Sequence, residues 1–339
     1  MQLSKFDFPF DPALIASQPV LPRDRARLLV VDRRAPSFAH RSIQDLPTLL
    51  SLGDLLVVNN TRVRPARIVG RKRRTGTEVE LLFVNGLSDG TWEVLVKGKL
   101  KPGDVVDVTP DSRVIIVERS GDRTRVKIES VKPRHEFFHE SGRMPLPPYI
   151  RRQPMDEDRE WYQTVFAQPE GAIAAPTAGL HFTPALLAAL QQRGIGVVTV
   201  TLHVGIGTFK PVTAERIEDH RMGAEWVDVG ADVVAAVDQA KRAGGRIVAV
   251  GTTVVRALET AARQDGPFGP YRGDTSLFIT PGCTFHVVDA MLTNFHLPRT
   301  TLLMLVSALA GTERLRQAYE EAVRERYRFY SYGDAMLIL

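Results

Sequence analysis

The segment AAPTAGLHFTPALLAALQQRG, residues 174–194, decides the fold class of the second half of the chain, because it runs from a tight loop directly into a helix pattern. Its small residues let backbone and ligand approach closely, and Gly179 can adopt a positive φ without steric cost. Thr183 is typical of a helix N-cap and Pro184 of the first helical position. We therefore expect His181 just before a helix N-terminus, where free backbone N–H groups can meet a ligand.

Helices and strands alternate from this segment to the C-terminus. The apolar patterns predict further helices at 231–243, 253–263, 300–311 and 313–327, and strands at 197–203, 247–250, 275–280 and 335–339. Two apolar runs near the N-terminus, 28–31 and 55–58, are typical of buried strands. Strands that alternate with helices predict an α/β fold, with a mostly parallel sheet that helices cover on both faces.

Residues 65–150 show a different pattern of predicted secondary structure, with short strands and no long helix. Turn signals such as Asp89-Gly90 separate six short β-rich runs, at 66–72, 78–85, 91–98, 105–109, 113–119 and 124–129. Six closely spaced strands predict a small antiparallel β-barrel, of the general kind that binds oligonucleotides. The N-terminal strands need partners, so we expect residues 1–64 and 151–339 to form one discontinuous α/β domain, with the barrel at 65–150 inserted into it.

The bulk composition is that of an ordinary globular protein. The 339 residues are enough for two domains, and 44 basic against 39 acidic residues give a formal net charge of +5, which permits a polyanionic partner without requiring one. The one cysteine, Cys283, excludes an intrachain disulfide and a cysteine-rich metal site. Residues 1–12 show no signal-peptide pattern, and the most apolar run, 300–311, is shorter than the roughly 20 residues that span a bilayer. We expect a cytoplasmic monomer that makes no membrane contact.

Seven basic side chains fall within thirteen residues at the start of the barrel, with no acid among them: Arg62, Arg64, Arg67, Arg71, Lys72, Arg73 and Arg74. Arginines at alternate strand positions project from one face and suit contacts with phosphates. The alternative is a solvated, positively charged strand edge that blocks aggregation. The position of this basic stripe beside a barrel favours RNA, whose binding should then weaken steeply as salt rises.

The sequence TLHVGIGTF at 201–209 ends an expected strand with a Gly-x-Gly turn at Gly205 and Gly207. A dinucleotide-binding fingerprint needs another glycine where Lys210 stands, and Pro211 prevents the helix that should follow. The sequence therefore disfavours Rossmann-type NAD binding. A looser nucleoside-binding loop and a plain tight turn both remain open.

Gly251-Thr252-Thr253 falls between an expected parallel strand and a helix, at the strand end where α/β proteins usually bind ligands. Its free N–H groups and hydroxyls suit a carboxylate or a sugar. An ordinary N-cap is the alternative for either threonine taken singly. Glu259, farther down the same helix, is expected to face solvent or to serve packing.

Three histidines are expected at strand ends or in loops: His181, His203 and His296. This shared placement favours a common pocket, although a single histidine is more often structural. Asn294 and His296 lie in the apolar stretch TNFHLP and need hydrogen-bond partners. Metal binding is disfavoured, because no pair of histidines shows close ligand spacing. Near the C-terminus, the segment Tyr330-Ser331-Tyr332-Gly333-Asp334 offers aromatic faces for stacking a base, and core packing is the commoner use of such tyrosines.

Several ordered blocks of sequence match a known family. They are NNTRV at 59–63, PAR at 65–67, MPLPPYI at 144–150, YQTV at 162–165, AAPTAGLHF at 174–182, TLHVGIGTF at 201–209, GTT at 251–253, TNFHLP at 293–298 and YGDAM at 332–336. On these motifs the chain resembles the S-adenosylmethionine:tRNA ribosyltransferase-isomerases of queuosine biosynthesis over essentially its whole length. The resemblance implies an α/β domain with an inserted β-barrel, which agrees with the interpretation above, and it implies no metal or redox cofactor.

The resemblance also implies a reaction. The ribosyl part of S-adenosylmethionine, the donor substrate, is transferred to the aminomethyl group of 7-aminomethyl-7-deazaguanine at the wobble position of tRNA. Isomerisation of the sugar to an epoxycyclopentanediol gives epoxyqueuosine and releases adenine and methionine. The main alternative is a non-catalytic tRNA-binding paralogue, against which the three histidines and residues 251–253 argue. A nucleoside transferase with a small-molecule acceptor is a weaker alternative.

This chemistry needs a base near C5′ of the sulfonium nucleoside, a proton donor for adenine and a neutral attacking amine. Histidines suit the proton transfers, and a carboxylate can orient or replace one of them, so the catalytic candidates are His181, His203, His296, Glu225 and Asp289. The substrate-binding candidates are Thr177, Gly179, Gly205, Gly207, Thr252, Thr253, Asn294 and Tyr332, and the basic stripe is the tRNA-binding candidate. The family usually carries His-x-Met-His where residues 220–223 are HRMG, so the role of position 223 stays open.

Overall fold

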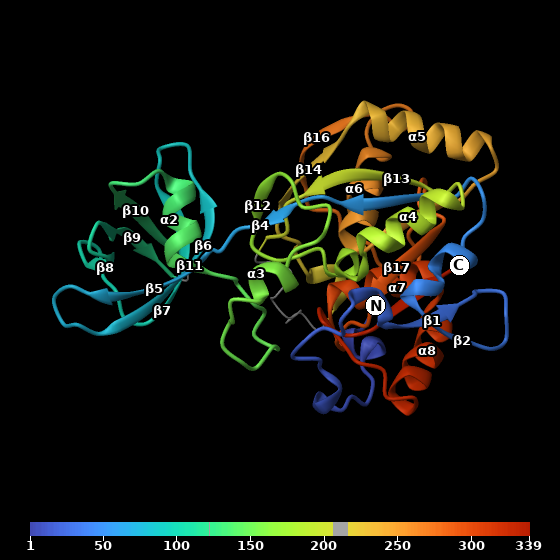
Figure 1. Ribbon diagram of the computed structural model, residues 1–339, viewed down its shortest axis with the longest axis horizontal. Coiled ribbons are helices and arrows are strands. Elements are labelled where there is room, and N and C mark those ends of the chain that lie inside the picture. Colours follow the sequence, from blue (N-terminus) through green and yellow to red (C-terminus); the bar gives the residue numbers. More distant parts are fainter. Residues whose placement is uncertain (122, 206–215) are drawn as a thin grey trace.

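The computed structural model describes residues 1–121, 123–205 and 216–339, and it contains two large sheets in separate parts of the molecule (Figure 1). The larger sheet has nine strands in the order β16-β14-β13-β3-β15-β17-β18-β1-β2. The strands are β1 (Arg27–Val31), β2 (Ala39–Ser42), β3 (Leu55–Asn59), β13 (Gly196–Leu202), β14 (Glu225–Val229), β15 (Ile247–Val250), β16 (Tyr271–Thr275), β17 (Ala290–Asn294) and β18 (Ala335–Ile338).

This sheet is parallel at its centre and antiparallel toward its edges. Strand β3 pairs in parallel with β13 and β15, β15 with β17, and β1 with β18. The pairs β17–β18, β13–β14, β14–β16 and β1–β2 are antiparallel. β3 is buried along its whole length, as expected of a strand that is covered on both faces. The predicted α/β class is confirmed, and the sheet is mixed.

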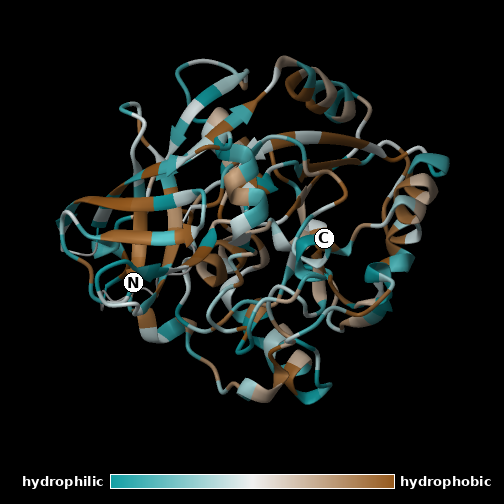
Figure 2. Ribbon diagram, turned by 60° about the vertical axis from the view of Figure 1, so that its left-hand side comes forward, coloured by the Kyte–Doolittle hydropathy of each residue, from teal (hydrophilic) through white to brown (hydrophobic). Residues whose placement is uncertain are grey.

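Helices cover both faces of this sheet, because successive strand residues face opposite sides. Leu29 and Val57 pack in one hydrophobic cluster with helices α5 to α8, whereas Leu28 and Leu56 pack in a second cluster with α1 and α4. The helices are α1 (Leu46–Leu49), α4 (Pro184–Gln192), α5 (Ala231–Arg242), α6 (Thr252–Ala261), α7 (Thr301–Ala310) and α8 (Thr312–Arg324). Figure 2 shows hydrophobic residues along the strands of both sheets, while the helices mix hydrophobic and hydrophilic positions. No helix among the described residues is long and apolar enough to cross a membrane.

Four strands of this sheet lie where the sequence does not predict them: β2, β14, β16 and β17. The predicted strand at 275–280 is wrong, because the observed strand β16 ends at Thr275. Strand β17 was not predicted at all. Its five residues are all buried, so they show no alternation of polar and apolar positions that would distinguish a strand from a buried loop or helix.

Six strands close the smaller sheet into the predicted barrel, in the order β5-β6-β7-β10-β9-β8, because β8 also pairs with β5. They are β5 (Arg67–Lys72), β6 (Glu78–Gly86), β7 (Trp92–Lys97), β8 (Val105–Thr109), β9 (Ser112–Ser120) and β10 (Arg123–Ser130). Helix α2 (Arg134–Ser141), which the sequence did not predict, buries Phe137 and Phe138 in the barrel core. Strand β11 (Gly142–Arg143) pairs with the outer edge of β5.

Short segments join the barrel to the larger part of the molecule (Figure 1). Strand β4 (Arg62–Val63) pairs in parallel with β12 (Glu170–Ala172), and the adjoining Ile173 belongs to the barrel core. The guanidinium carbon of Arg64 lies 4.8 Å from the ring centroid of Trp92 in the barrel. The barrel is therefore held to two segments: residues 62–64, which lead into it, and residues 170–173, which come after it in the chain. The predicted domain boundaries, 64/65 and 150/151, stay predictions.

Candidate active site

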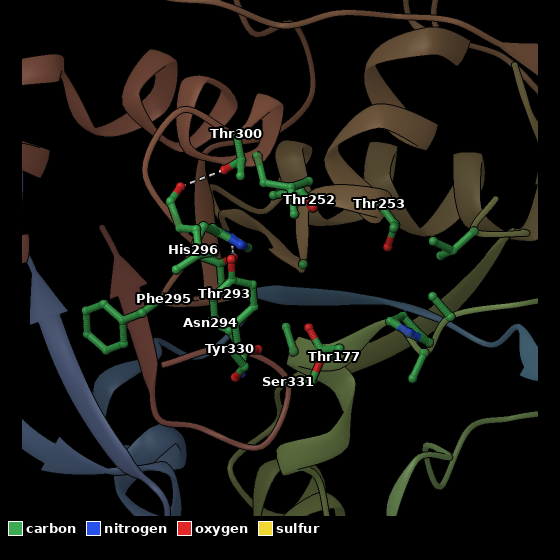
Figure 3. A pocket seen from close by; sticks show the side chains of 18 of the residues that line it. Thr177, Thr252, Thr253, Thr293, Asn294, Phe295, His296, Thr300, Tyr330 and Ser331 are labelled. Carbon is green, nitrogen blue, oxygen red and sulfur yellow. Dashed lines mark hydrogen bonds between the residues drawn. The ribbon is translucent and has the colours of Figure 1, made fainter. Parts of the chain in front are cut away.

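A cavity of about 300 Å³ opens at the carboxyl ends of β15 and β17 (Figure 3). Ligand sites of open α/β sheets gather at this edge, where the strands lead into loops and helix N-termini. Most of the wall comes from four stretches of chain, 174–178, 251–253, 293–298 and 330–331. All four were singled out in the sequence, and the structure brings them together.

The turn between β15 and α6 supplies one wall. Gly251 has φ +91°, a value that favours glycine, and its N–H donates to the carbonyl of Leu292 at 2.8 Å. It is the N-cap of α6, which has no side-chain cap, so the N-cap interpretation of Thr252 and Thr253 is wrong. Both threonines line the cavity, and the Thr253 hydroxyl accepts a hydrogen bond from Asn59 Nδ2 at 3.2 Å. As first-turn residues of α6, they have no acceptor within the helix for their backbone N–H groups.

His296 lines the cavity from the loop after β17. Its Nε2 is hydrogen-bonded to the Thr293 hydroxyl at 2.9 Å (Figure 3). Its backbone N–H donates to the Tyr319 hydroxyl at 2.8 Å. Burial lowers the pKa of His296 to about 4, because the charged form loses its hydration. The ring is therefore neutral near pH 7 and can accept a proton.

His181 closes the short turn η5 (Thr177–His181) and is fully buried behind the cavity wall. Its Nε2 accepts a hydrogen bond from Asn294 Nδ2 at 3.2 Å, and the same amide nitrogen donates to the Tyr330 carbonyl at 2.9 Å. Because Nε2 acts as the acceptor, the hydrogen-bond network assigns the ring proton to Nδ1. Burial, together with nearby arginines, lowers the pKa of His181 to about 3. The ring does not line the cavity but holds Asn294, which does.

His203 lies apart from the other two histidines. Its ring stacks on Trp226 with centroids 5.1 Å apart, and its Nδ1 is hydrogen-bonded to the Thr61 hydroxyl at 2.7 Å. Burial and the charge of Arg64 lower the pKa of this half-buried ring. The next residue, Val204, lines the cavity, whereas His203 itself does not. The three histidines therefore do not share one pocket wall.

Neither carboxylate candidate lines the cavity. Glu225 forms a buried ion pair with Arg256 and accepts a hydrogen bond from the Gly205 N–H at 2.8 Å, so it holds the backbone at Gly205. Asp289 accepts a hydrogen bond from the N–H of Ile247, the first residue of β15, at 2.9 Å. That is the opposite end of the sheet, about 16 Å from the cavity at roughly 3.3 Å of rise per strand residue.

Among the glycine and threonine candidates, Thr177 lines the cavity and Gly179 does not. A Cβ on Gly179 would lie 3.0 Å from the Thr164 methyl carbon, so this glycine serves close packing in η5. Gly207 lies outside the described residues. The small residues of 174–178 do form cavity wall, as the sequence suggested.

The aromatic wall of the cavity differs from the one expected. Tyr332 packs in the core, and its hydroxyl donates to Asp158, at the start of helix α3 (Asp158–Trp161), at 2.8 Å. Tyr330, the other tyrosine of the 330–334 segment, does line the cavity, and its ring stacks on that of Tyr149, which sequence reasoning did not propose as a site residue, with centroids 3.8 Å apart. Burial raises the pKa of both phenols, so they stay protonated at neutral pH. The position of Tyr149 in the family motif at 144–150 was the available signal.

The basic stripe is largely paired with acids. The partners of Arg64, Arg67, Arg71, Lys72 and Arg73 are Glu170, Glu80, Glu78, Asp104 and Asp107. Arg62 donates to the Ala167 carbonyl at 2.6 Å, and Arg74 is exposed. Exposed ion pairs contribute little to stability, so the exposed arginines can exchange an acid for a phosphate. The predicted tRNA contact of this stripe stays a prediction.

Within the described ranges, no group of three or more His, Cys, Asp or Glu side chains is placed to hold a metal ion. Gly223, where the family motif has a histidine, is exposed, and a Cβ there would meet no atom of the described residues within 4 Å. Nearby, His220 packs edge-on against Phe278 with centroids 5.3 Å apart. As far as the described residues are concerned, a side chain at position 223 would have room.

Known proteins match the chain from end to end. A family model described as queuosine biosynthesis protein matches residues 3–338. A relative from Aquifex aeolicus (strain VF5), named S-adenosylmethionine:tRNA ribosyltransferase-isomerase, is 48% identical over 100% of both chains. A relative of the same name from Stenotrophomonas maltophilia (strain R551-3) is 47% identical over 100% of this chain and 98% of its own.

A solved structure is also similar to this chain. It is the S-adenosylmethionine tRNA ribosyltransferase from Thermotoga maritima, which is 38% identical, with 99% of this chain and 100% of that chain covered and a TM-score of 0.58. The sequence match and the structural match thus extend over both the barrel and the larger sheet. The chain belongs to the family of queuosine biosynthesis proteins.

Proposed function

We propose that this protein is an S-adenosylmethionine:tRNA ribosyltransferase-isomerase and that the cavity beside β15 and β17 binds the donor. It transfers and isomerises the ribosyl part of S-adenosylmethionine onto 7-aminomethyl-7-deazaguanine at the tRNA wobble position, giving epoxyqueuosine, adenine and methionine. Full-length relatives at 48% identity carry this name. The atoms of the product come from the two substrates and the overall reaction is redox-neutral, so we propose that no cofactor is needed.

The chemical character of the cavity is the observation that carries this proposal. None of its described lining residues is Asp, Glu, Lys or Arg. A cationic sulfonium nucleoside therefore meets no like charge there, and the attacking amine stays neutral because a dry site lowers its pKa. The hydroxyls of Thr177, Thr252 and Thr253 are placed to bind the donor's sugar.

His296 is the base that the geometry supports best. Of the three candidate histidines, it is the one whose ring lines the cavity, and Thr293 fixes its orientation through Nε2. The neutral ring can take a proton from the acidic carbon beside the sulfonium. Tyr162 also lines the cavity, and burial raises the pKa of its hydroxyl, so the hydroxyl stays protonated and is our candidate for donating a hydrogen bond to the departing adenine.

The test is adenine release. Purified protein is incubated with S-adenosylmethionine labelled in the adenine ring and with tRNA that carries 7-aminomethyl-7-deazaguanine, and tRNA with guanine at the same position is the control. We expect release only with the modified tRNA. His296→Gln should lower kcat by about 100- to 10,000-fold if this ring moves a proton.

The matched control is His40→Gln, on the exposed edge strand β2, which should retain activity. Tight binding of tRNA without adenine release by the wild-type protein would contradict the enzymatic function. Near-normal turnover of His296→Gln would contradict the assignment of the base and leave the function intact.

A further inference from the structure

Tyr330 has a backbone conformation that is rare for a bulky residue, with φ +68°. Such a conformation persists only where the surrounding structure holds it, and it often marks a functional site. Here three hydrogen bonds hold the residue. Its N–H donates to the Phe295 carbonyl at 3.1 Å, while its carbonyl accepts from the Gly333 N–H at 2.9 Å and from Asn294 Nδ2 at 2.9 Å.

This backbone places the Tyr330 ring on the cavity wall. The ring stacks on Tyr149, with an interplanar angle of 33°, and the Tyr149 hydroxyl is hydrogen-bonded to the Ser331 hydroxyl at 2.7 Å. Both tyrosines are half-buried and line the cavity. In Figure 3, Tyr330 and Ser331 lie on one wall beside Asn294. We call the stacked pair Tyr149 and Tyr330 the tyrosine wall.

The contact between His181 and Asn294 supports this wall from behind. The two hydrogens of the Asn294 amide go to the Tyr330 carbonyl and to His181 Nε2, so the amide has one orientation. Both side chains are about 1% exposed. The amide hydrogens thereby hold the main chain at Tyr330, while the buried Asn294 Oδ1 and His181 Nδ1 have no hydrogen-bond partner among the described residues.

We propose that the tyrosine wall stacks against the adenine ring of S-adenosylmethionine, and that His181 and Asn294 are positioning residues that hold Tyr330 in place for this contact. The inference rests on the proposed function, which supplies the donor. Aromatic side chains bind bases through their π-faces. A flat base covers the whole exposed face of such a stack, which a sulfonium centre does not. The hydroxyls of 252–253 are then left for the sugar.

Two substitutions at Tyr330 test the stacking. Tyr330→Leu removes the aromatic face, whereas Tyr330→Phe keeps it and removes a hydroxyl that has no hydrogen bond to any described residue. The measurements, at saturating acceptor tRNA, are the KM for S-adenosylmethionine and the inhibition constant of S-adenosylhomocysteine, which has the same adenine and a neutral sulfur. We expect Tyr330→Leu to raise both by the same factor, about 10- to 100-fold. Tyr330→Phe should stay within about 2-fold of wild type.

The supporting residues are tested through the same two constants. His181→Phe and Asn294→Ala should each raise both constants by about 3- to 10-fold and leave the pH dependence of kcat unchanged, because neither residue moves a proton. The double variant Tyr330→Leu/Asn294→Ala should be no worse than Tyr330→Leu alone, since the amide acts through the ring that is already absent.

Three results would overturn the inference: an unchanged KM in Tyr330→Leu, a loss that affects the sulfonium donor but not S-adenosylhomocysteine, or a fall of 100-fold or more in kcat of His181→Phe at unchanged KM. If the wild-type protein released no adenine, the proposed function would fail instead. In that case the stacking on the tyrosine wall is tested by calorimetry, which compares the affinities of the wild type and Tyr330→Leu for S-adenosylhomocysteine. Equal affinities would overturn the inference.

Discussion

Burial sets the ionisation of the two histidines nearest the cavity. It is the first cause of the low pKa in both, about 3 for His181 and about 4 for His296. A histidine that stays neutral at pH 7 acts through its lone pair and its one N–H. That property suits His181 for orienting an amide and His296 for accepting a proton, so one physical cause serves two different roles.

The same burial makes stability depend on pH. Between pH 6.5 and about 4 the unfolded chain binds protons at these two positions that the folded chain does not. The free energy of unfolding therefore falls as the pH is lowered through this window. We expect His181→Gln to be less stable than wild type at pH 7.5 but to lose less stability between pH 6.5 and 4.5, as measured by urea unfolding. His135→Gln, at an exposed position on α2, is the control and should keep the wild-type slope. An unchanged slope in His181→Gln would show that this ring is not a source of the acid sensitivity.

At the scale of single elements, local signals predicted the helices well. Helix α4 begins at Pro184, and the Thr183 hydroxyl accepts from the Leu186 N–H at 3.1 Å, as the sequence implied. Capping is a matter of neighbouring residues, so it can be recognised from sequence. Helix α6 differs, because its N-cap is Gly251 in a conformation that depends on the contact with Leu292 of the adjacent strand. Contacts between elements of this kind have no local signal.

The residues of the site divide in the same way, into those with a local sequence signal and those brought together by contacts between elements. Thr252 and His296 were found because they stand at the ends of strands and in loops, where ligands bind. Tyr149 comes from the chain that leaves the barrel and meets Tyr330 from near the C-terminus, a pairing that only the folded chain brings about. Asp289 lies at the amino end of β17, whereas the cavity lies at the carboxyl end of this strand. Asp289 is therefore too far from the cavity to be a catalytic residue.

Glu259 in α6 gives a test at this scale. Its fully buried carboxylate accepts hydrogen bonds from the backbone N–H groups of residues 286–288 at 3.0 to 3.1 Å and from Arg263 at 2.6 Å. It thereby anchors the loop before β17 to α6. Glu259→Gln replaces an acceptor oxygen by an N–H₂ donor, so we expect a loss of about 2 to 3 kcal/mol in the free energy of unfolding.

The measurement is urea denaturation together with the KM for S-adenosylmethionine, which should not change because Glu259 does not line the cavity. Glu320→Gln, on the exposed face of α8, should cost less than about 0.5 kcal/mol. Equal stability of the two variants would mean that the anchored loop contributes nothing.

At the scale of the whole molecule, acidic residues of the barrel form ion pairs with most of the basic stripe. The strand count and closure were predictable, because turn signals mark the ends of short β-rich runs. The pairing of Arg71 with Glu78 across β5 and β6, and of Arg73 with Asp107 of β8, depends on strand register, which the sequence does not specify. A stripe that looks uniformly cationic in sequence is therefore mostly neutralised when folded.

Charge pairing in the barrel makes a prediction about tRNA binding. Asp107→Asn would release the exposed Arg73 from its ion pair and make one more cation available to a phosphate. Each added phosphate contact steepens the dependence of log K on log salt by about 0.7 to 0.9. We therefore expect tighter tRNA binding at low salt and a salt slope steeper by about one such contact, measured by fluorescence anisotropy across a salt series.

The control variant for this measurement is Asp228→Asn, which releases Arg272 from an equivalent exposed pair on the edge strands β14 and β16. It changes the net charge of the molecule by the same amount but lies on the larger sheet. A steeper slope in Asp107→Asn alone places tRNA phosphates against the barrel. Equal salt slopes in both variants would mean that only the net charge of the molecule matters. A steeper slope in Asp228→Asn alone would mean that tRNA binds the larger sheet and not the barrel.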